Sequence, residues 1–258
     1  MPYIEINQTR YYYAGDIKRN GIPVVFCHGS GGGHHHWLLQ LQGLREPVNP
    51  IAVDLPGHGR SEGKPMNTVA DYRDWLHRFS KAAGIGSFVP AGHSLGGAIV
   101  LDYALHYPED IKGLILIGTG GRLKVLPAIL ESLKKGSVPE TFSDFLYSAE
   151  APDELMQRGR EEVLNTEPSL YYADLCACNE FDVMEMLHRI SKPALIICGS
   201  NDQLTPVKYS RYMENSLPES CVEIIDKAGH MVMLEKPEEL NRTITNFIEC
   251  LLSNSQIN

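Results

Sequence analysis

The stretch Ala91-Gly92-His93-Ser94-Leu95-Gly96-Gly97 contains a Gly-x-Ser-x-Gly pattern. The residues before it, Ser87–Ala91, form an apolar run typical of a strand, and Leu95–Tyr107 has the pattern of a helix. A serine at such a strand-to-helix turn is exposed at the end of its strand. The small residues beside it let strand and helix approach closely. The stretch therefore predicts that Ser94 is a nucleophile.

On both sides of this stretch, short apolar runs alternate with longer helical patterns. The runs typical of strands are Tyr3–Ile6, Arg10–Ala14, Pro23–Cys27, Asn49–Val53, Ser87–Ala91, Gly113–Ile117, Ala194–Cys198 and Val222–Ile225. The helical patterns are Thr68–Ala83, Leu95–Tyr107, Pro206–Ser216 and Pro237–Leu252. The central runs are almost continuously apolar, as strands buried on both faces are. This alternation predicts an α/β fold, with a mostly parallel sheet and helices on both faces.

One long segment breaks the alternation. From Gly121 to Ile190 the chain has helical patterns and several prolines, but no run typical of a strand. This segment predicts an all-helical insertion between two strands of the sheet.

A serine hydroxyl needs a base within hydrogen-bond reach and a group that orients the base. Asp202 directly follows the run Ala194–Cys198, and His230 follows the run Val222–Ile225. The chain order serine, acid, histidine is typical of a triad at one edge of a parallel sheet. We therefore expect Asp202 to hold the imidazole tautomer, and His230 to move the proton of Ser94.

The serine's chemistry also needs backbone N–H donors for the oxyanion formed on attack. The run Pro23–Cys27 continues into His28-Gly29-Ser30-Gly31-Gly32-Gly33, the type of loop that supplies one donor. We expect the N–H groups of Ser30 and Leu95 to act, although the neighbouring glycines leave the register of the loop open. Three successive glycines cost conformational entropy unless something approaches the backbone closely.

The composition of the chain argues against some classes of binding partner and indicates where in the cell to expect the protein. The chain has 258 residues, of which 43% are hydrophobic, and a net charge of −9. This charge argues against binding to nucleic acid or to an anionic membrane surface. No apolar run approaches the ~18 residues of a membrane span, and the first residues lack the pattern of a signal peptide. Six sparse cysteines do not indicate a disulfide scaffold, so we expect a cytoplasmic protein.

Taken together, these motifs resemble the α/β-hydrolase superfamily along nearly the whole chain, including Asp54-Leu55-Pro56-Gly57-His58-Gly59-Arg60-Ser61. The chain looks most like small esterases and lactonases with a helical cap. This resemblance implies an eight-stranded sheet, with residues 1–120 and 191–258 as the α/β-hydrolase core and 121–190 as the cap. Relatives that attack with aspartate, the haloalkane dehalogenases and epoxide hydrolases, are disfavoured by Ser94.

Other features suggest chemistry that their spacing does not support. Consecutive histidines, His34-His35-His36, cannot all face one ion from a regular helix or strand, so we expect no metal. His35 or His36 is expected to border the pocket or face solvent. Cys176 and Cys178 lack the spacing of zinc or redox motifs, and Asp54 and His58 are expected to hold a structural turn.

The sequence thus predicts a cofactor-independent carboxylic ester hydrolase that acts on small soluble esters, as a monomer or homodimer. Substrate contacts are expected from Gly29, His93, Leu126, Phe142, Leu146 and Met231. Further apolar residues expected to line or close the acyl pocket are Leu123, Ile129, Leu130, Phe145 and Met184, with a contribution from either Met231 or Met233. The same triad is compatible with a C–C bond hydrolase, an enol-lactonase or an acyl transferase. A non-catalytic ligand-binding protein is the alternative from another class.

Overall fold

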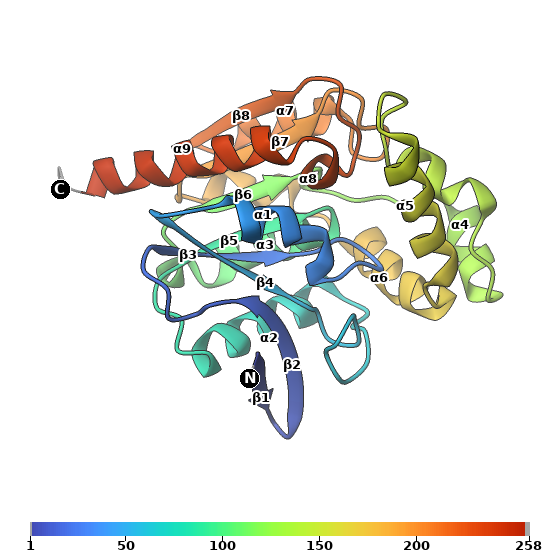
Figure 1. The fold of residues 1–258 in the computed structure, drawn as a ribbon, viewed down its shortest axis with the longest axis horizontal. Helices are drawn as coiled ribbons and strands as arrows, with labels where there is room; N and C mark the ends of the chain where they lie inside the picture. The colour runs from blue at the N-terminus through green and yellow to red at the C-terminus, as the bar shows by residue number, and fades with distance from the viewer. Residues whose placement is uncertain (1, 256–258) are drawn as a thin grey trace.

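The computed structural model describes residues 2–255 and contains one sheet with the strand order β1-β2-β4-β3-β5-β6-β7-β8 (Figure 1). The strands are β1 (Tyr3–Ile6), β2 (Thr9–Gly15), β3 (Ile22–Cys27), β4 (Val48–Val53), β5 (Val89–His93), β6 (Leu114–Ile117), β7 (Ala194–Gly199) and β8 (Ser220–Ile225). Strands β1 and β2 pair antiparallel, as do β2 and β4, and the remaining pairs are parallel. The sheet therefore confirms the predicted α/β-hydrolase fold.

Helices cover both faces of the sheet and one end of it (Figure 1). They are α1 (Leu38–Gly43), α2 (Val69–Ala82), α3 (Leu95–His106), α4 (Pro127–Lys134), α5 (Asp153–Asn165), α6 (Pro168–Glu180), α7 (Val207–Ser216), α8 (Val232–Glu235) and α9 (Pro237–Ser255). Within the described part of the chain, four 3₁₀ helices lie between them: η1 (His34–Trp37), η2 (Pro108–Asp110), η3 (Glu140–Phe145) and η4 (Met184–Arg189). Among residues 2–255, no helix is both long and apolar enough to cross a membrane.

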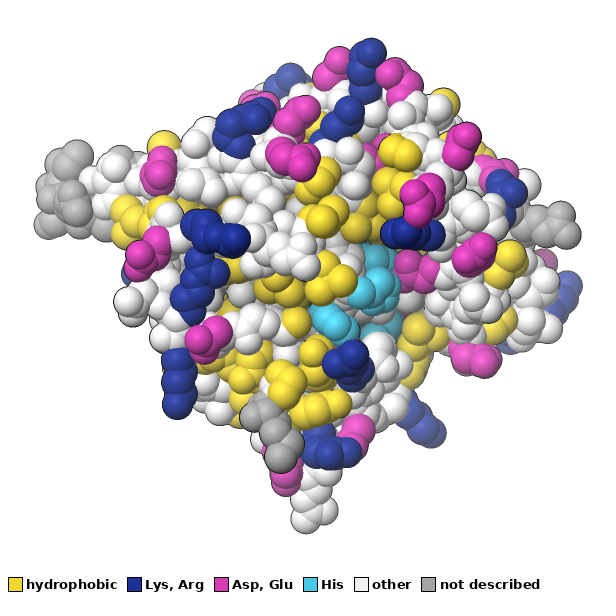
Figure 2. All heavy atoms as spheres, in the orientation of Figure 1, with side chains coloured by type: hydrophobic (Ala, Val, Ile, Leu, Met, Phe, Trp, Pro, Cys, Tyr) yellow, Lys and Arg dark blue, Asp and Glu magenta, His cyan; other side chains and the backbone are white. Residues whose placement is uncertain are grey.

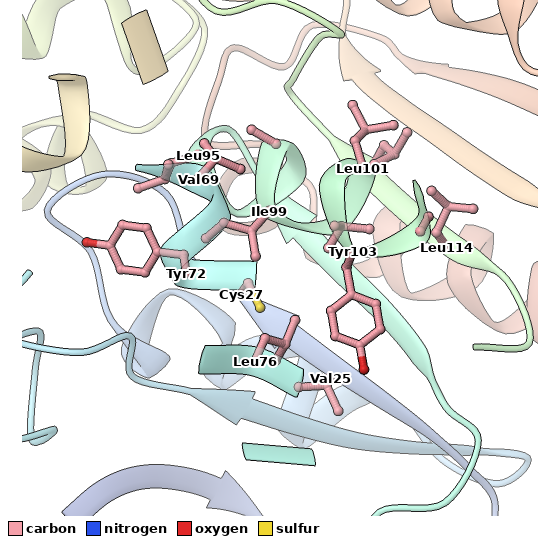
Figure 3. Packing of buried hydrophobic residues seen from close by; sticks show 14 of the residues in the cluster. Val25, Cys27, Val69, Tyr72, Leu76, Leu95, Ile99, Leu101, Tyr103 and Leu114 are labelled. Carbon is pink, nitrogen blue, oxygen red and sulfur yellow. The ribbon is translucent and has the colours of Figure 1, made fainter. Parts of the chain in front are cut away.

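Alternate residues of each central strand pack into two separate cores, because successive side chains of a strand point to opposite faces. In β3, Val25 and Cys27 pack with the side chains of α2 and α3, whereas Val24 and Phe26 pack with those of α1 and α9. Figure 3 shows the first of these cores, in which Val25 and Cys27 lie beside Leu76 of α2. Both faces of the sheet are thus buried, as the uninterrupted apolar runs predict.

Residues 121–190 lie between β6 and β7 in the chain and contain α4, α5, α6 and two of the 3₁₀ helices. In Figure 1 these three α-helices are grouped at one end of the sheet, away from α1, α2 and α9. We call these residues the cap segment. An isolated bridge between Arg122 and Asp182 joins its two ends, and no longer strand is present in the segment.

Candidate active site

Ser94 lies at the turn from β5 into α3, with φ 52° and ψ −113°. A positive φ is unusual for a residue with a side chain, and at such a turn it indicates strain held by the surrounding structure. Two hydrogen bonds hold the turn: the Ser94 N–H donates to the Ile117 carbonyl at 3.0 Å, and the Thr119 hydroxyl donates to the Ser94 carbonyl at 2.8 Å. The predicted strand–serine–helix arrangement is confirmed.

The glycines of the motif are required by close approach. A Cβ on Gly92 would lie 2.1 Å from the Gly96 carbonyl oxygen, and a Cβ on Gly96 would lie 2.3 Å from that of Cys27. A Cβ on Gly97 would meet the Thr119 side chain at 2.4 Å. Backbone atoms cannot move away from such contacts cheaply, so Gly92 and Gly96 exclude a larger residue. At Gly97 the buried Thr119 side chain leaves no space for one. The two strands β3 and β5 and the helix α3 are thereby brought together around Ser94.

Asp202 and His230 follow β7 and β8 and meet at the same edge of the sheet. Asp202 Oδ2 lies 2.9 Å from His230 Nδ1 and accepts a second hydrogen bond from the Thr205 hydroxyl at 2.7 Å. The other oxygen accepts from the N–H groups of Leu204 and Thr205, both at 2.9 Å. Burial raises the pKa of Asp202, but the charge of His230 and these hydrogen bonds outweigh it and hold the pKa well below its usual range. The carboxylate is therefore ionised and fixed against the imidazole.

His93 contacts His230 of this pair. Its Nε2 lies 3.0 Å from the His230 carbonyl oxygen, and the two rings are 4.5 Å apart. Burial first, and then the charge of His230, hold the pKa of His93 well below its usual range. A neutral His93 ring can donate Nε2–H to that carbonyl, so the residue positions the backbone of His230.

The loop after β3 lies directly beside Ser94. A Cβ on Gly29 would be 3.3 Å from the Ser94 Cβ. Among the described residues, neither the Ser30 N–H nor the Leu95 N–H has a hydrogen-bond acceptor. Leu95 begins α3, where the first backbone N–H groups point out of the helix end. Two free donors therefore flank the serine, one on the loop after β3 and one at the first residue of α3.

One face of the cap helix α6 is packed against this loop. Tyr171, Asp174 and Cys178 are spaced three and four residues apart, so they share one side of the helix. A Cβ on Gly31 would meet the Tyr171 ring at 2.3 Å, and Ser30 Oγ lies 3.9 Å from Cys178 Sγ. The conformational entropy cost of a glycine at position 31 is thus explained, because the Tyr171 ring occupies the space that a side chain there would need.

Asp174 makes the polar contacts of that face. It is fully buried and accepts hydrogen bonds from the Gly31 N–H at 2.9 Å, from His58 Nε2 at 2.9 Å and from the Tyr72 hydroxyl at 2.7 Å. Burial lowers the pKa of His58, but the charge and hydrogen bond of Asp174 outweigh burial and raise it overall. His58 therefore joins its turn to the cap segment, in addition to the structural role expected for it.

A cavity of about 360 Å³ lies between the sheet edge and the cap segment and is lined by Ser94, Ser30 and His230. All six residues predicted to contact substrate line it: Gly29, His93, Leu126, Phe142, Leu146 and Met231. Leu123, Ile129 and Phe145 line it as well. Leu130 and Met184 are not among the described lining residues, and of the two alternatives Met231 and Met233, Met231 lines the cavity. Met233 is fully buried in the core instead, because it faces the sheet from α8.

The three consecutive histidines divide between two partners. His34 Nδ1 lies 2.9 Å from Asp54 Oδ1, and Asp54 also accepts from the Arg60 N–H at 2.9 Å, which fixes the turn after β4. His35 and His36 both reach Glu162 of α5. This acidic neighbour lies 127 residues from His35 and 126 from His36 in the chain, so the spacing of residues around the histidine run does not indicate it.

Sequence patterns gave no signal for three acidic residues that organise the site: Asp174, Glu162 and Glu235. Glu235 accepts hydrogen bonds from the Gly229 N–H and the Ser148 N–H, each at 3.0 Å, and so ties the loop of His230 to the cap segment. Each of these acids has partners far away in the sequence.

A mostly parallel eight-stranded sheet with a serine at the turn after a central strand defines an α/β-hydrolase fold. The sequence profile described as the alpha/beta hydrolase family matches residues 24–243. The chain belongs to this family.

Particular relatives and solved structures extend the comparison. A solved thermophilic esterase is 32% identical, with a TM-score of 0.84 over 96% of this chain and 97% of that one. The biotin biosynthesis bifunctional protein BioHC of Teredinibacter turnerae is 28% identical over 94% of this chain, which spans 47% of that protein. The 2-hydroxy-6-oxononadienedioate/2-hydroxy-6-oxononatrienedioate hydrolase of Burkholderia vietnamiensis is 27% identical over 93% of this chain and 91% of its own length.

Proposed function

We propose that this protein is a serine esterase that hydrolyses carboxylic esters of small soluble substrates through an acyl-enzyme. The observation that carries the proposal is the cavity beside Ser94, which His230 also lines while its imidazole is hydrogen-bonded to Asp202 at 2.9 Å. The 32% identity to a thermophilic esterase supports the same reaction class.

In the proposed reaction, Ser94 Oγ attacks the ester carbonyl carbon while His230 takes the hydroxyl proton. The carbonyl oxygen becomes negative and accepts hydrogen bonds from the N–H groups of Ser30 and Leu95. His230 then gives the proton to the leaving alcohol as the bond between carbon and alcohol oxygen breaks. Water, deprotonated by His230, attacks the acyl carbon. The bond between that carbon and Ser94 Oγ then breaks, His230 returns the proton to Oγ, and the acid is released. Asp202 holds the imidazole orientation and stabilises its charged form throughout.

The cavity favours a neutral substrate with an apolar acyl group. Its wall is largely apolar, with Leu123, Ile129 and Phe142 from the cap segment. The charged residues that line it are Lys124 and Glu162. Lys124 Nζ donates to the Asn179 carbonyl at 2.6 Å, so its charge is held at the rim by a neighbouring helix end.

A second candidate function is the reaction named for the Burkholderia vietnamiensis relative, hydrolysis of a dienedioate, and the charges at the cavity argue against it. That enzyme's named substrates carry two carboxylates, whereas Glu162 places a negative charge in the wall of this cavity. An anion there is stabilised by cationic donors such as arginine. No arginine lines the described cavity, and its lysine, Lys124, is already hydrogen-bonded to the Asn179 carbonyl. We therefore rank ester hydrolysis above cleavage of a dioate, and test linear esters, enol-lactones and β-diketone-type substrates side by side.

The decisive experiment compares the natural chain with Ser94→Ala in p-nitrophenyl butyrate hydrolysis and in labelling by a fluorophosphonate. We expect the natural chain to hydrolyse the ester and take one label on Ser94, and the variant to lose both by at least ~10³-fold. Urea unfolding of the two proteins checks that the fold is retained. Full activity in Ser94→Ala would refute the mechanism, and absence of label and turnover in the natural chain would favour a non-catalytic ligand-binding protein.

A further inference from the structure

Two adjacent histidines of η1 meet one glutamate of the cap helix α5. His35 Nε2 lies 2.7 Å and His36 Nε2 lies 2.8 Å from the same oxygen, Glu162 Oε1. The ligand-type atoms of these three residues all lie within 4.8 Å of one another. Figure 2 shows histidine side chains gathered on this face of the molecule near an acidic side chain. The cluster is separate from the candidate triad, because among the described residues no hydrogen bond or ion pair joins it to Ser94, Asp202 or His230.

Gly32 and Gly33 leave space for both imidazole rings in this position. A Cβ on Gly32 would lie 2.7 Å from the His36 ring, and a Cβ on Gly33 would lie 2.9 Å from His35 Nδ1. The two rings lie 4.5 Å apart and packed edge to face. The backbone thus leaves room for two imidazoles to present Nε2 to the cap segment side by side.

His36 is buried and makes its polar contact through one ring nitrogen, Nε2. The ring is buried, and its Nδ1 has no hydrogen-bond partner among the described residues. Its polar interactions are therefore made through Nε2, the atom that faces Glu162. A buried histidine with one unused nitrogen is costly unless the other makes a strong interaction. Glu162 supplies the charge, since its hydrogen bonds to both histidines overcome burial and hold its pKa well below the usual range.

We propose that His35, His36 and Glu162 bind a divalent transition-metal ion, with Zn²⁺ as the best match. Two imidazole nitrogens and one carboxylate are ligands that Zn²⁺ prefers, and three protein ligands leave a fourth position for water. Mg²⁺ and Ca²⁺ prefer oxygen ligands and are disfavoured here.

Metal binding requires a modest rearrangement. With bonds of about 2.0–2.1 Å, the ligand atoms of a tetrahedral site lie roughly 3.4 Å apart. The present separations of 2.7 and 2.8 Å from nitrogen to oxygen must therefore widen, as each Nε2 lone pair turns to the ion in place of an N–H donor. The His35 side chain is 46% exposed and that of Glu162 is 30% exposed, so both have freedom to adjust.

A metal at this position would join the loop that follows β3 to the cap segment. His36 and Glu162 also line the cavity that contains Ser94. A bound ion would therefore stiffen the cavity wall and change access to the serine. This consequence for turnover rests on the proposed esterase activity, whereas metal binding itself does not.

The test measures Zn²⁺ binding to the full chain, prepared without a polyhistidine tag, by competition with a chromophoric chelator. Glu162→Gln removes the anionic ligand but keeps an oxygen that can accept from both histidines. Glu161→Gln makes the same change on the same helix at an exposed neighbour and is the matched control. His35→Gln tests a nitrogen ligand. We expect one Zn²⁺ per chain in the natural protein and in Glu161→Gln, and at least ~10-fold weaker binding in Glu162→Gln and His35→Gln.

Co²⁺ absorption provides a second readout, since a tetrahedral site gives intense visible bands that the Glu162→Gln protein should lack. Equal Zn²⁺ affinity in all four proteins, or no saturable binding in the natural chain, would overturn the proposal and leave the cluster as two hydrogen bonds between core and cap segment. Urea midpoints within the error of the natural chain exclude misfolding as the cause of lost binding. Zn²⁺ should slow ester turnover in the natural chain and in Glu161→Gln only. If no protein turns over any ester, the binding data still decide the metal site.

Discussion

Replacing Asp174 by asparagine should weaken both the fold and the oxyanion loop. Asp174 Oδ2 accepts from Gly31 and His58, and its Oδ1 accepts from the Tyr72 hydroxyl. An asparagine retains one carbonyl oxygen for the first two donors, but presents an amide N–H₂ to Tyr72. The Tyr72 oxygen already accepts from the Met66 N–H at 3.0 Å. The buried Tyr72 O–H is therefore left without an acceptor.

The magnitude follows from these losses. An unsatisfied buried hydroxyl costs about 1–3 kcal/mol, and the hydrogen bond from His58 loses about 1 kcal/mol when its acceptor is no longer charged. We expect Asp174→Asn to lower the free energy of unfolding by about 3 kcal/mol in urea denaturation. Asp182→Asn, at an exposed aspartate of the same cap segment, should change it by no more than about 0.5 kcal/mol.

Stability should also lose part of its pH dependence. Because Asp174 raises the pKa of His58 in the folded state, the pair stabilises the protein fully below the unfolded value of about 6.5. This contribution is lost as pH rises from there through the raised folded pKa. In Asp174→Asn the slope over that range should flatten, because the charge that raises the pKa of His58 is gone.

Turnover provides the third measurement. Gly31 follows the expected donor Ser30, and a displacement of about 1 Å at such a loop costs roughly 10²-fold in rate. The oxyanion exists only beyond the ground state, so kcat should fall while KM stays nearly constant. The role given to this carboxylate would be refuted if Asp174→Asn had the same free energy of unfolding as the natural chain and the same dependence of that free energy on pH. This holds whatever the activity of the variant.

Two further predictions concern backbone conformation. Ser94→Gly should be more stable than Ser94→Ala by about 1–2 kcal/mol in urea unfolding, because φ 52° with ψ −113° is strained for any residue with a Cβ; equal midpoints would contradict the strain. Gly31→Ala should destabilise by about 1–3 kcal/mol more than Gly136→Ala, because both positions have positive φ but only the first has a ring 2.3 Å from the new Cβ, while the second has open space. Similar losses in the two alanine variants would show that the contact between Tyr171 and the loop is not tight.

The sheet and the order of the candidate triad were predictable because they depend on local patterns. Apolar runs fix the strands, and the ends of parallel strands meet at one edge of a sheet. Asp202 and His230 each follow such a run directly, so their proximity follows from topology alone. The pairing of β1 with β2 is equally local, because Asn7 and Gln8 between them both have the positive φ of a tight hairpin turn.

The acids that connect the cap segment to the core were not predictable in this way. Asp174 lies 143 residues from Gly31, and Glu162 lies 127 residues from His35. A charged residue in a helix is normally taken as part of its solvated face, and no periodic pattern identifies the exception. The sequence of a helix indicates which of its faces is apolar, but not which segment packs against that face. Which polar side chains of α5 and α6 turn inward therefore depends on how these helices pack on the rest of the protein.

The run His34-His35-His36 is a second case in which the contacts depend on packing that the sequence does not indicate. The expectation that consecutive histidines cannot converge holds for a regular helix or strand, and His34 does turn away to Asp54. In the short 3₁₀ helix η1, however, His35 and His36 both face α5. The loop from Gly31 to His36 is therefore fixed largely from the cap segment, by Asp174 at one end and Glu162 at the other. If this loop supplies an oxyanion donor, substitutions at these two acids should lower kcat, although both lie on helices that would otherwise be expected to control only substrate binding.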